Sequence, residues 1–398
     1  MQKYQSDCVF PLSQDPIPKG IVVAEANGVI CDVIDPGKLD YDIEDVEKLN
    51  GLLCPGFVNT HAHLELSYLR NKIPKANGLP AFINNVQQHK KNSSTPHDMI
   101  KHHINDAHKM METNGIVACG DVANTSITAE IKARSKIYYH TFIELYGMQP
   151  AKAGLILNNG LALYNEFKNA NNNFSVSITP HAFYSVSDEL LNKVYKHVKT
   201  QKGLLSIHHL ENDEEILFIE EHKGHFLKAF KEMGIEKSSI TSTKKQSIDS
   251  LYKKIPSNIK TLLVHNTFAK TSHVDKAIQY SENIWWCLCP NSNLYIENAL
   301  PDFGLFLAHK SRVTIGTDSL ASNSRLSVLE ELKTIQRNTD ISTHQLLHWG
   351  ILNGAIFLGI DDTYGSLKPG KKPGLICIEK IKKEDFSFSE NASVKKIL

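Results

Sequence analysis

The chain has 398 residues, which is too long for one small module and long enough for a large enzyme domain with an accessory piece. With 44 Lys and Arg against 43 Asp and Glu, its formal charge is +1, which argues against a nucleic-acid or other polyanion partner. No apolar run approaches the roughly 18 residues of a membrane helix, and the first residues lack the order of a signal peptide. We therefore expect a cytoplasmic protein that binds neither nucleic acid nor membranes.

Both ends of the chain have the character of short strands and turns. Residues 20–35 contain β-branched stretches interrupted by Asn27 and Gly28, a pair that is typical of a β-hairpin. Residues 365–379 combine turn residues with a second strand-like stretch. We predict that residues 1–54 and 362–398 pair into a small β-sandwich side domain.

Between the two ends, apolar strand-like segments alternate with helical ones. Helical periodicity is found at 95–115, 187–203, 272–281 and 327–338. Eight segments are predicted as strands: 56–63, 115–123, 136–145, 174–182, 203–211, 261–267, 283–290 and 312–318. This alternation indicates an α/β fold of the (β/α)8 TIM-barrel type over residues 55–361, rather than a doubly wound sheet.

The seven cysteines are odd in number and lie mostly inside apolar, strand-like runs. This pattern favours buried, reduced thiols over a disulfide framework. Cys287 and Cys289 form a C-x-C pair that could bind a metal. Alternate positions on one strand are the simpler interpretation, because no second cysteine pair completes a site.

Metal-binding side chains are concentrated at the ends of the predicted strands, where barrel enzymes carry their active sites. His61 and His63 end the first strand, and their spacing turns both side chains to one face. His208 lies near the end of the fifth strand, His265 near the end of the sixth, and Asp318 closes the eighth. An H-x-H pair alone is a weak signal among 19 histidines, so the joint placement carries the prediction of a metal site.

The residue types indicate which metal. Three imidazoles and a carboxylate without a thiolate suit Zn²⁺, and Fe or Mn is also compatible. An open position for water would make such a site catalytic, because a bound divalent ion lowers the pKa of water from 15.7 to about 7.

Hydrolysis of a carbon–nitrogen bond also requires a proton shuttle, because nitrogen leaves poorly as an anion. Glu211 follows His208 by three residues and is predicted to lie beside the metal, where it could move a proton from water to the substrate nitrogen. A solvated acid in the charged run 211–215 is the alternative. His265 is either a further ligand or a group that polarises the attacked centre, and the second is favoured because four ligands already satisfy the metal.

These residues carry a resemblance to the amidohydrolase superfamily, and within it to deaminases of S-adenosylhomocysteine, methylthioadenosine, guanine and aminodeoxyfutalosine. It covers nearly the whole chain. Six segments resemble family motifs in the same order: 55–67, 177–187, 207–215, 262–267, 289–296 and 316–332.

The resemblance implies roles for individual residues. The implied metal ligands are His61, His63, His208 and Asp318. Glu211 is implied as the proton shuttle, His265 as a group on the leaving-group side and His181 as a substrate contact. It also favours one ion, because two-metal relatives bridge their ions with a modified lysine at the end of the fourth strand and no lysine ends that segment here. Barrels of this type often form homodimers, although no interface is evident in the sequence.

The activity that we predict is zinc-dependent hydrolytic deamination of a purine-like or nucleoside-like small molecule. Residues 63–74 are similar to the first loop of aminodeoxyfutalosine deaminases, which favours that substrate. The alternative is a hydrolase of the same fold that opens a cyclic amide or removes chloride or another leaving group. Glu65 in this loop could bind ribose hydroxyls or be a surface acid, and the sequence leaves both interpretations open.

Overall fold

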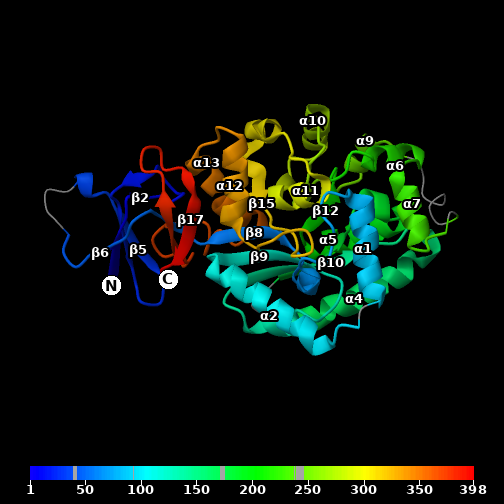
Figure 1. Cartoon of the computed structure of the whole chain (residues 1–398), viewed down its shortest axis with the longest axis horizontal. Helices are drawn as coiled ribbons and strands as arrows, with labels where there is room; N and C mark the ends of the chain where they lie inside the picture. The colour runs from blue at the N-terminus through cyan, green and yellow to red at the C-terminus, as the bar shows by residue number, and fades with distance from the viewer. Residues whose placement is uncertain (39–42, 93, 171–174, 237, 239–245) are drawn as a thin grey trace.

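The computed structural model describes residues 1–38, 43–92, 94–170, 175–236, 238 and 246–398. Residues 39–42, 93, 171–174, 237 and 239–245, which include the first residue of the predicted fourth strand, lie outside the described residues. The fold belongs to the α/β class. One part of the molecule consists of parallel strands with helices around them, and the other consists of β-sheets that contain both chain termini (Figure 1).

Every strand predicted for the central part of the chain is present. The parallel strands are β8 Phe57–Ala62, β9 Ile116–Ala123, β10 Tyr138–Leu145, β11 Ser175–Pro180, β12 Leu205–His209, β13 Thr261–His265, β14 Ile284–Leu288 and β15 Val313–Ile315. They form two four-stranded sheets, in the orders β11-β10-β9-β8 and β12-β13-β14-β15. Single parallel bridges join the sheets at both edges, between Ala62 and Asp318 and between Ala182 and His208. Buried side chains run almost without interruption along these strands, as expected for parallel strands covered on both faces.

The four predicted helices are confirmed as α2 His97–Thr113, α5 Asp188–Gln201, α10 Thr271–Tyr280 and α12 Val328–Asn338. Three helices were not predicted from the sequence: α1 Leu79–Asn92, α4 Ala153–Ala170 and α11 Pro290–Glu297. Prolines, glycines and asparagines inside these segments weaken the intrinsic helical signal, so tertiary packing decides their structure. The remaining described α-helices are α3 Ala129–Arg134, α6 Glu215–Glu221, α7 His225–Glu232, α9 Ile248–Tyr252, α13 Thr343–Leu347 and α14 Asn353–Leu358.

The two ends of the chain share a sheet. The terminal strands are β1 Gln2–Gln5, β2 Cys8–Val9, β3 Ile17–Pro18, β4 Ile21–Ala24, β5 Ile30–Ile34, β6 Glu47–Lys48, β7 Leu52–Pro55, β16 Leu375–Ile381 and β17 Phe388–Lys396. They form sheets in the orders β5-β4-β1-β6 and β17-β16-β7-β2-β3. Strands β4 and β5 form the predicted hairpin, and Gly28 in its turn has φ +90, which glycine adopts without strain.

The cysteines are as predicted. All seven are free, and six of them are buried. The sulfur atoms of Cys287 and Cys289 lie 3.9 Å apart, on and just after β14. Among the helices that the structure describes, none is both long and apolar enough to cross a membrane.

Candidate metal centre

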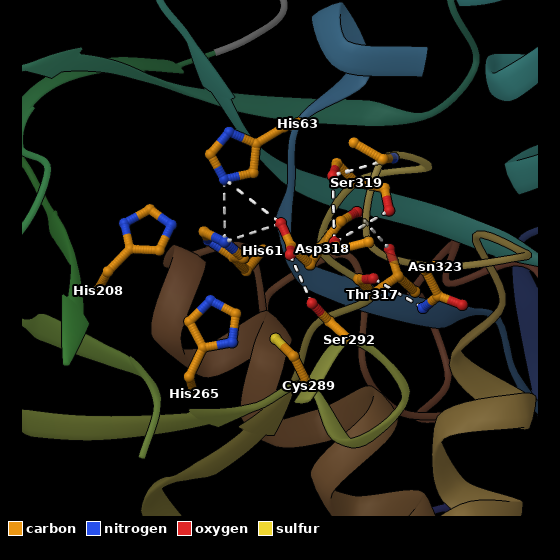
Figure 2. A network of polar contacts seen from close by, with 12 residues as sticks. His61, His63, His208, His265, Cys289, Ser292, Thr317, Asp318, Ser319 and Asn323 are labelled. Atoms are coloured by element: carbon orange, nitrogen blue, oxygen red, sulfur yellow. Dashed lines mark hydrogen bonds and ion pairs between the residues drawn. The ribbon is translucent and has the colours of Figure 1, made fainter. Parts of the chain in front are cut away.

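The predicted metal ligands meet at the carboxyl ends of the parallel strands (Figure 2). Donor atoms of His61, His63 and Asp318 lie within 4.8 Å of one another, and so do those of His61, His208 and His265. The two groups share His61. The structure therefore places the four predicted ligands together and adds His265 at a comparable distance.

Unusual backbone conformations occur at these strand ends. Leu210, His265, Asn266 and Asp318 have φ values of +46, +75, +57 and +54, in the left-handed region that non-glycine residues rarely adopt. Hydrogen bonds hold two of these turns, because Asp318 N donates to the His61 carbonyl at 3.0 Å and Asn266 N donates to the His209 carbonyl at 2.9 Å. Strain of this kind is typical of functional sites that the surrounding fold holds in place.

Asp318 lies three residues beyond β15 and faces the histidine pair. Its Oδ1 is 3.7 Å from His61 Nε2 and 3.6 Å from His63 Nε2, and the two Nε2 atoms are 3.2 Å apart. The other oxygen, Oδ2, accepts hydrogen bonds from the hydroxyls of Ser292 and Ser322. The serines therefore fix the carboxylate so that Oδ1 points to the imidazoles (Figure 2).

Hydrogen bonds also orient two of the rings. His208 Nδ1 lies 3.0 Å from the carbonyl oxygen of His181, and His265 Nδ1 lies 2.9 Å from Asn293 Oδ1. Because both partners are acceptors, Nδ1 carries the proton and Nε2 keeps its lone pair. This is the arrangement in which a histidine binds a metal through Nε2. The buried Nδ1 of His61 has no hydrogen-bond partner among the described residues.

The electrostatics suit a cation. Burial, with further contributions from the neighbouring histidines, holds the pKa of His61 well below its ordinary value, and burial lowers the pKa of His63 and of His265 to about 4. Burial alone would raise the pKa of Asp318, but His63, His265 and the serine hydroxyls lower it to about 2. Neutral imidazoles beside an ionised carboxylate are the donor set that a divalent ion such as Zn²⁺ requires, so these residues fit a metal.

Strand alternation separates the two adjacent histidines of β12. His208 faces the cluster, whereas the ring of His209 lies between Asn266 Oδ1 and the Tyr252 hydroxyl, at 2.8 and 2.6 Å. Successive side chains of a strand point to opposite faces, so only one of the pair can reach the centre.

Glu211 is buried beside the cluster, with 3% of its surface exposed, which rules out the solvated alternative. Its Oε1 lies 3.6 Å from His265 Nε2. Its backbone N–H donates to Glu215 Oε2 at 3.1 Å. Burial raises the pKa of Glu211 well above its ordinary range, and the negative charges of Asp318, Glu297 and Glu215 raise it further.

A cavity of about 860 Å³ opens above these groups. Its base includes His63, His208, Glu211, His265 and Asp318. Its outer wall combines apolar side chains with amides and lysines. Helix α1 contributes Phe82, Ile83, Val86 and Lys90, and the loop after β10 contributes Met148 and Gln149. Helix α7 and the residues after it contribute Phe230 and Ile235. The cavity is large enough for a small molecule that extends well beyond a single heterocyclic ring.

His181, which only the family resemblance singled out, lines this cavity just after β11. Its Nδ1 lies 2.8 Å from Ser185 Oγ, and its ring centroid lies 4.6 Å from that of His208. Glu144 was not predicted as a site residue. It lines the cavity from β10 and forms a third cluster with His181 and His208. Its position at the end of a predicted strand was the only available signal.

Glu65 is neither a surface acid nor a residue that lines the cavity. It is 6% exposed, and its Oε2 accepts hydrogen bonds from the backbone N–H groups of Asn124 and Thr125 and from the Thr125 hydroxyl. Its Oε1 lies 3.7 Å from Lys90 Nζ. The carboxylate therefore ties the loop after β8 to the loop after β9.

Comparison with known proteins gives the family. The model of the Amidohydrolase family matches residues 52–398, which is most of the chain. The chain belongs to the amidohydrolase family. As an amidohydrolase it is an enzyme that hydrolyses carbon–nitrogen bonds.

The matching sequences are deaminases, and solved structures of the same fold include a chlorohydrolase. It is 28% identical to an aminodeoxyfutalosine deaminase of Nitratiruptor over 293 residues, which cover 71% of this chain and 67% of the relative. Its fold matches that of aminofutalosine deaminase from Helicobacter pylori in complex with methylthio-coformycin, with a TM-score of 0.80, 21% identity and coverage of 96% and 94% of the two chains. It also matches atrazine chlorohydrolase from Arthrobacter aurescens, with a TM-score of 0.71, 14% identity and coverage of 95% and 87%.

Proposed function

We propose that this amidohydrolase is a zinc-dependent deaminase that removes an amino group from a purine-like nucleoside. The observation that carries the proposal is the position of Glu211. Its buried carboxylate lies 3.6 Å from His265 Nε2, at the base of a cavity that it shares with the cluster of histidines and Asp318. A proton-transferring acid next to a metal-binding set is what hydrolytic removal of ammonia requires.

We assign one Zn²⁺ to His61, His63, His208 and Asp318. When bound, such an ion supplies Lewis acidity that lowers the pKa of water from 15.7 to about 7. Ser292 and Ser322 hold Asp318, and the His181 carbonyl holds His208, so that the donor set is arranged before the ion arrives.

The chain's own residues then handle the proton and the substrate. Glu211 takes a proton from water at one carboxylate oxygen and delivers it to the substrate nitrogen. His265, fixed by Asn293, presents Nε2 on the leaving-group side of the same space. His181, just after β11, contacts the substrate. Apolar side chains of the outer wall, among them Phe82, Ile83 and Phe230, offer a packing surface for the substrate.

Aminodeoxyfutalosine is the substrate that we favour, because a relative by sequence is named aminodeoxyfutalosine deaminase and a structure of the same fold is named aminofutalosine deaminase. A relative named adenosine deaminase, from Helicobacter pylori, is 26% identical over 332 residues. The alternative, opening of a cyclic amide or removal of chloride or another leaving group, draws support only from the shared fold of the triazine hydrolases.

We further propose that residues 55–361 form a (β/α)8 barrel and that residues 1–54 and 362–398 form the β-sandwich side domain. The two bridges that join the edges of the parallel sheets support closure into a barrel. The antiparallel pairing of β16 with β7, from opposite ends of the chain, supports a shared side domain.

Ammonia release tests the proposal. The zinc-loaded protein is incubated with aminodeoxyfutalosine, 5′-methylthioadenosine, adenosine, guanine and a chlorinated triazine, and ammonia and chloride are both measured. We expect ammonia from at least one nucleoside and no chloride from the triazine. Chloride without ammonia would establish the alternative, and ammonia from none of these compounds would overturn the proposed deamination.

A further inference from the structure

The Glu144 carboxylate is held rigidly at the wall of the cavity. Glu144 lies next to the last residue of β10 and is 7% exposed. Its Oε2 accepts a hydrogen bond at 3.1 Å from Asn124 Nδ2, and the backbone N–H of Asn124 donates to Glu65 at 3.0 Å. Glu65 therefore fixes Asn124, and Asn124 fixes Glu144.

The other oxygen of Glu144 has no hydrogen bond among the described residues. Oε1 lies 3.6 Å from His208 Nδ1, which is too long for a hydrogen bond. The single proton on Nδ1 instead goes to the His181 carbonyl at 3.0 Å. Oε1 thus accepts no hydrogen bond from the described part of the protein, Glu144 lines the cavity, and a ligand there that supplies a donor would satisfy this oxygen.

The strand order shows which part of a substrate Glu144 would meet. Glu144 lies on β10, and His208 lies on β12, two strands further round. His265 lies on β13, on the other side of His208, and Glu211 contacts it. A molecule that has its reacting carbon beside Glu211 and lies across His208 brings its non-reacting part to Glu144.

The chemistry of the carboxylate narrows the partner further. An ionised carboxylate only accepts hydrogen bonds. In an adenine nucleoside the donors are the exocyclic amine, which must lie beside Glu211, and the sugar hydroxyls. We propose that Glu144 is a specificity-determining residue that accepts hydrogen bonds from the ribose hydroxyls of the substrate. This inference rests on the proposed deamination. It makes that function more specific, because Glu144 would select ribonucleosides over deoxynucleosides.

The experiment compares nucleosides that differ only in these hydroxyls. Adenosine, 2′-deoxyadenosine, 3′-deoxyadenosine and 2′,3′-dideoxyadenosine are deaminated by the wild type, Glu144→Gln and Glu144→Ala. We expect the wild-type kcat/KM for adenosine to exceed that for the dideoxynucleoside by about 100-fold or more, because a site built to bind a hydroxyl rejects an analogue without it. Both variants should reduce this ratio to below about 10 by losing activity on adenosine while nearly keeping that on the dideoxynucleoside.

The matched control is Glu166→Gln, which removes the same charge from an exposed position on α4 outside the cavity lining. It should leave the ratio as in the wild type. Bound metal is measured in each variant, because a second cation held by Glu144 and His181 would appear as metal that is lost from Glu144→Gln. Such a loss, or a ratio that stays high in the variants, would overturn the assignment.

The test separates this assignment from the proposed function. If the wild type deaminates adenosine and dideoxyadenosine equally well, deamination stands and the role of Glu144 is refuted. If no nucleoside yields ammonia, calorimetric binding of adenosine and dideoxyadenosine to the zinc-loaded proteins decides the role of Glu144. Equal affinities of the wild type for the two compounds would then refute it as well.

Discussion

The Glu215 carboxylate accepts a hydrogen bond from the backbone N–H of Glu211 at 3.1 Å. Glu215 is the first residue of α6 and is fully buried. Leu210, the residue before Glu211, has the left-handed φ of +46. Glu215 thus stabilises the tight turn that directs Glu211 into the cavity, which makes it a positioning residue.

Replacing Glu215 should impair turnover more than binding. We expect Glu215→Ala to lower kcat by about 10- to 100-fold with little change in KM, because a small displacement of a reacting group has this effect. Glu215→Gln keeps an oxygen acceptor and should restore most of kcat. Asp213→Ala, an exposed acid of the same run, is the control and should retain wild-type kcat. A rise in KM alone would contradict a positioning role.

The same residue makes stability depend on pH. Burial raises the pKa of Glu215 from 4.5 to about 8, so between these values the folded state holds a proton that the unfolded state has lost. This contribution to stability is complete below pH 4.5 and is lost as the pH rises through about 8. Glu215→Gln should therefore lose less stability than the wild type over this range, measured by urea denaturation. An unchanged pH dependence would show that Glu215 is already ionised in the folded protein.

The proposed proton shuttle is tested by Glu211→Gln, which keeps the shape of the side chain and removes its ability to carry a proton. We expect kcat to fall by about 10²- to 10⁴-fold while the bound metal is retained. Glu221→Gln, an exposed position at the end of α6, is the matched control. Wild-type kcat in Glu211→Gln with full metal content would eliminate the shuttle.

The metal assignment is tested by metal content rather than by activity. His61→Ala and Asp318→Ala should each lose the bound ion, measured by mass spectrometry of the purified folded protein. His209→Ala removes the adjacent, oppositely directed imidazole of β12 and should retain the metal. A chelator should lower the Tm of the wild type, because an ion that binds only the folded state stabilises that state. At an ion concentration 100 times its Kd, this stabilisation is about 2.7 kcal/mol. Full metal occupancy in Asp318→Ala would refute the ligand set.

The strands and most of the site could be predicted from local patterns. Parallel strands buried on both faces are apolar runs that end abruptly in polar residues, so His61, His208 and His265 could be assigned to strand ends. Alternation along a strand explains why His61 and His63 turn to one side, and the structure brings their Nε2 atoms within 3.2 Å.

The missing parts depend on contacts between distant segments. Helix α1 has a proline and asparagines that hide its periodicity, and it is stabilised in part by Glu297, whose side chain accepts a hydrogen bond from Leu79 N. The roles of Glu65 and Glu144 are not visible in their own surroundings in the sequence, because Asn124, about 60 and 20 positions away, connects them. Family resemblance indicated His181, but no local pattern did.

A buried ion pair supports the loop that follows His63. Lys132 of α3 contacts Asp121 of β9 at 2.5 Å, and both side chains are fully buried. Asp121 also accepts a hydrogen bond from Leu64 N at 2.8 Å, and Lys132 donates to Thr141 Oγ1 at 3.0 Å. The pair thereby joins α3, two neighbouring strands and the residue directly after His63.

Removing one partner of this pair should be strongly destabilising. We expect Lys132→Met to lower the free energy of unfolding by about 3–5 kcal/mol, because it leaves the Asp121 carboxylate buried without a cation. Arg134→Ala on the same helix removes an exposed pair with Glu130 and should cost at most about 1 kcal/mol. The double variant Lys132→Met with Asp121→Asn should recover part of the loss, since no buried charge then remains. Urea denaturation measures all three, and a loss for Lys132→Met no larger than that for Arg134→Ala would show that the buried pair contributes no more to stability than a surface one.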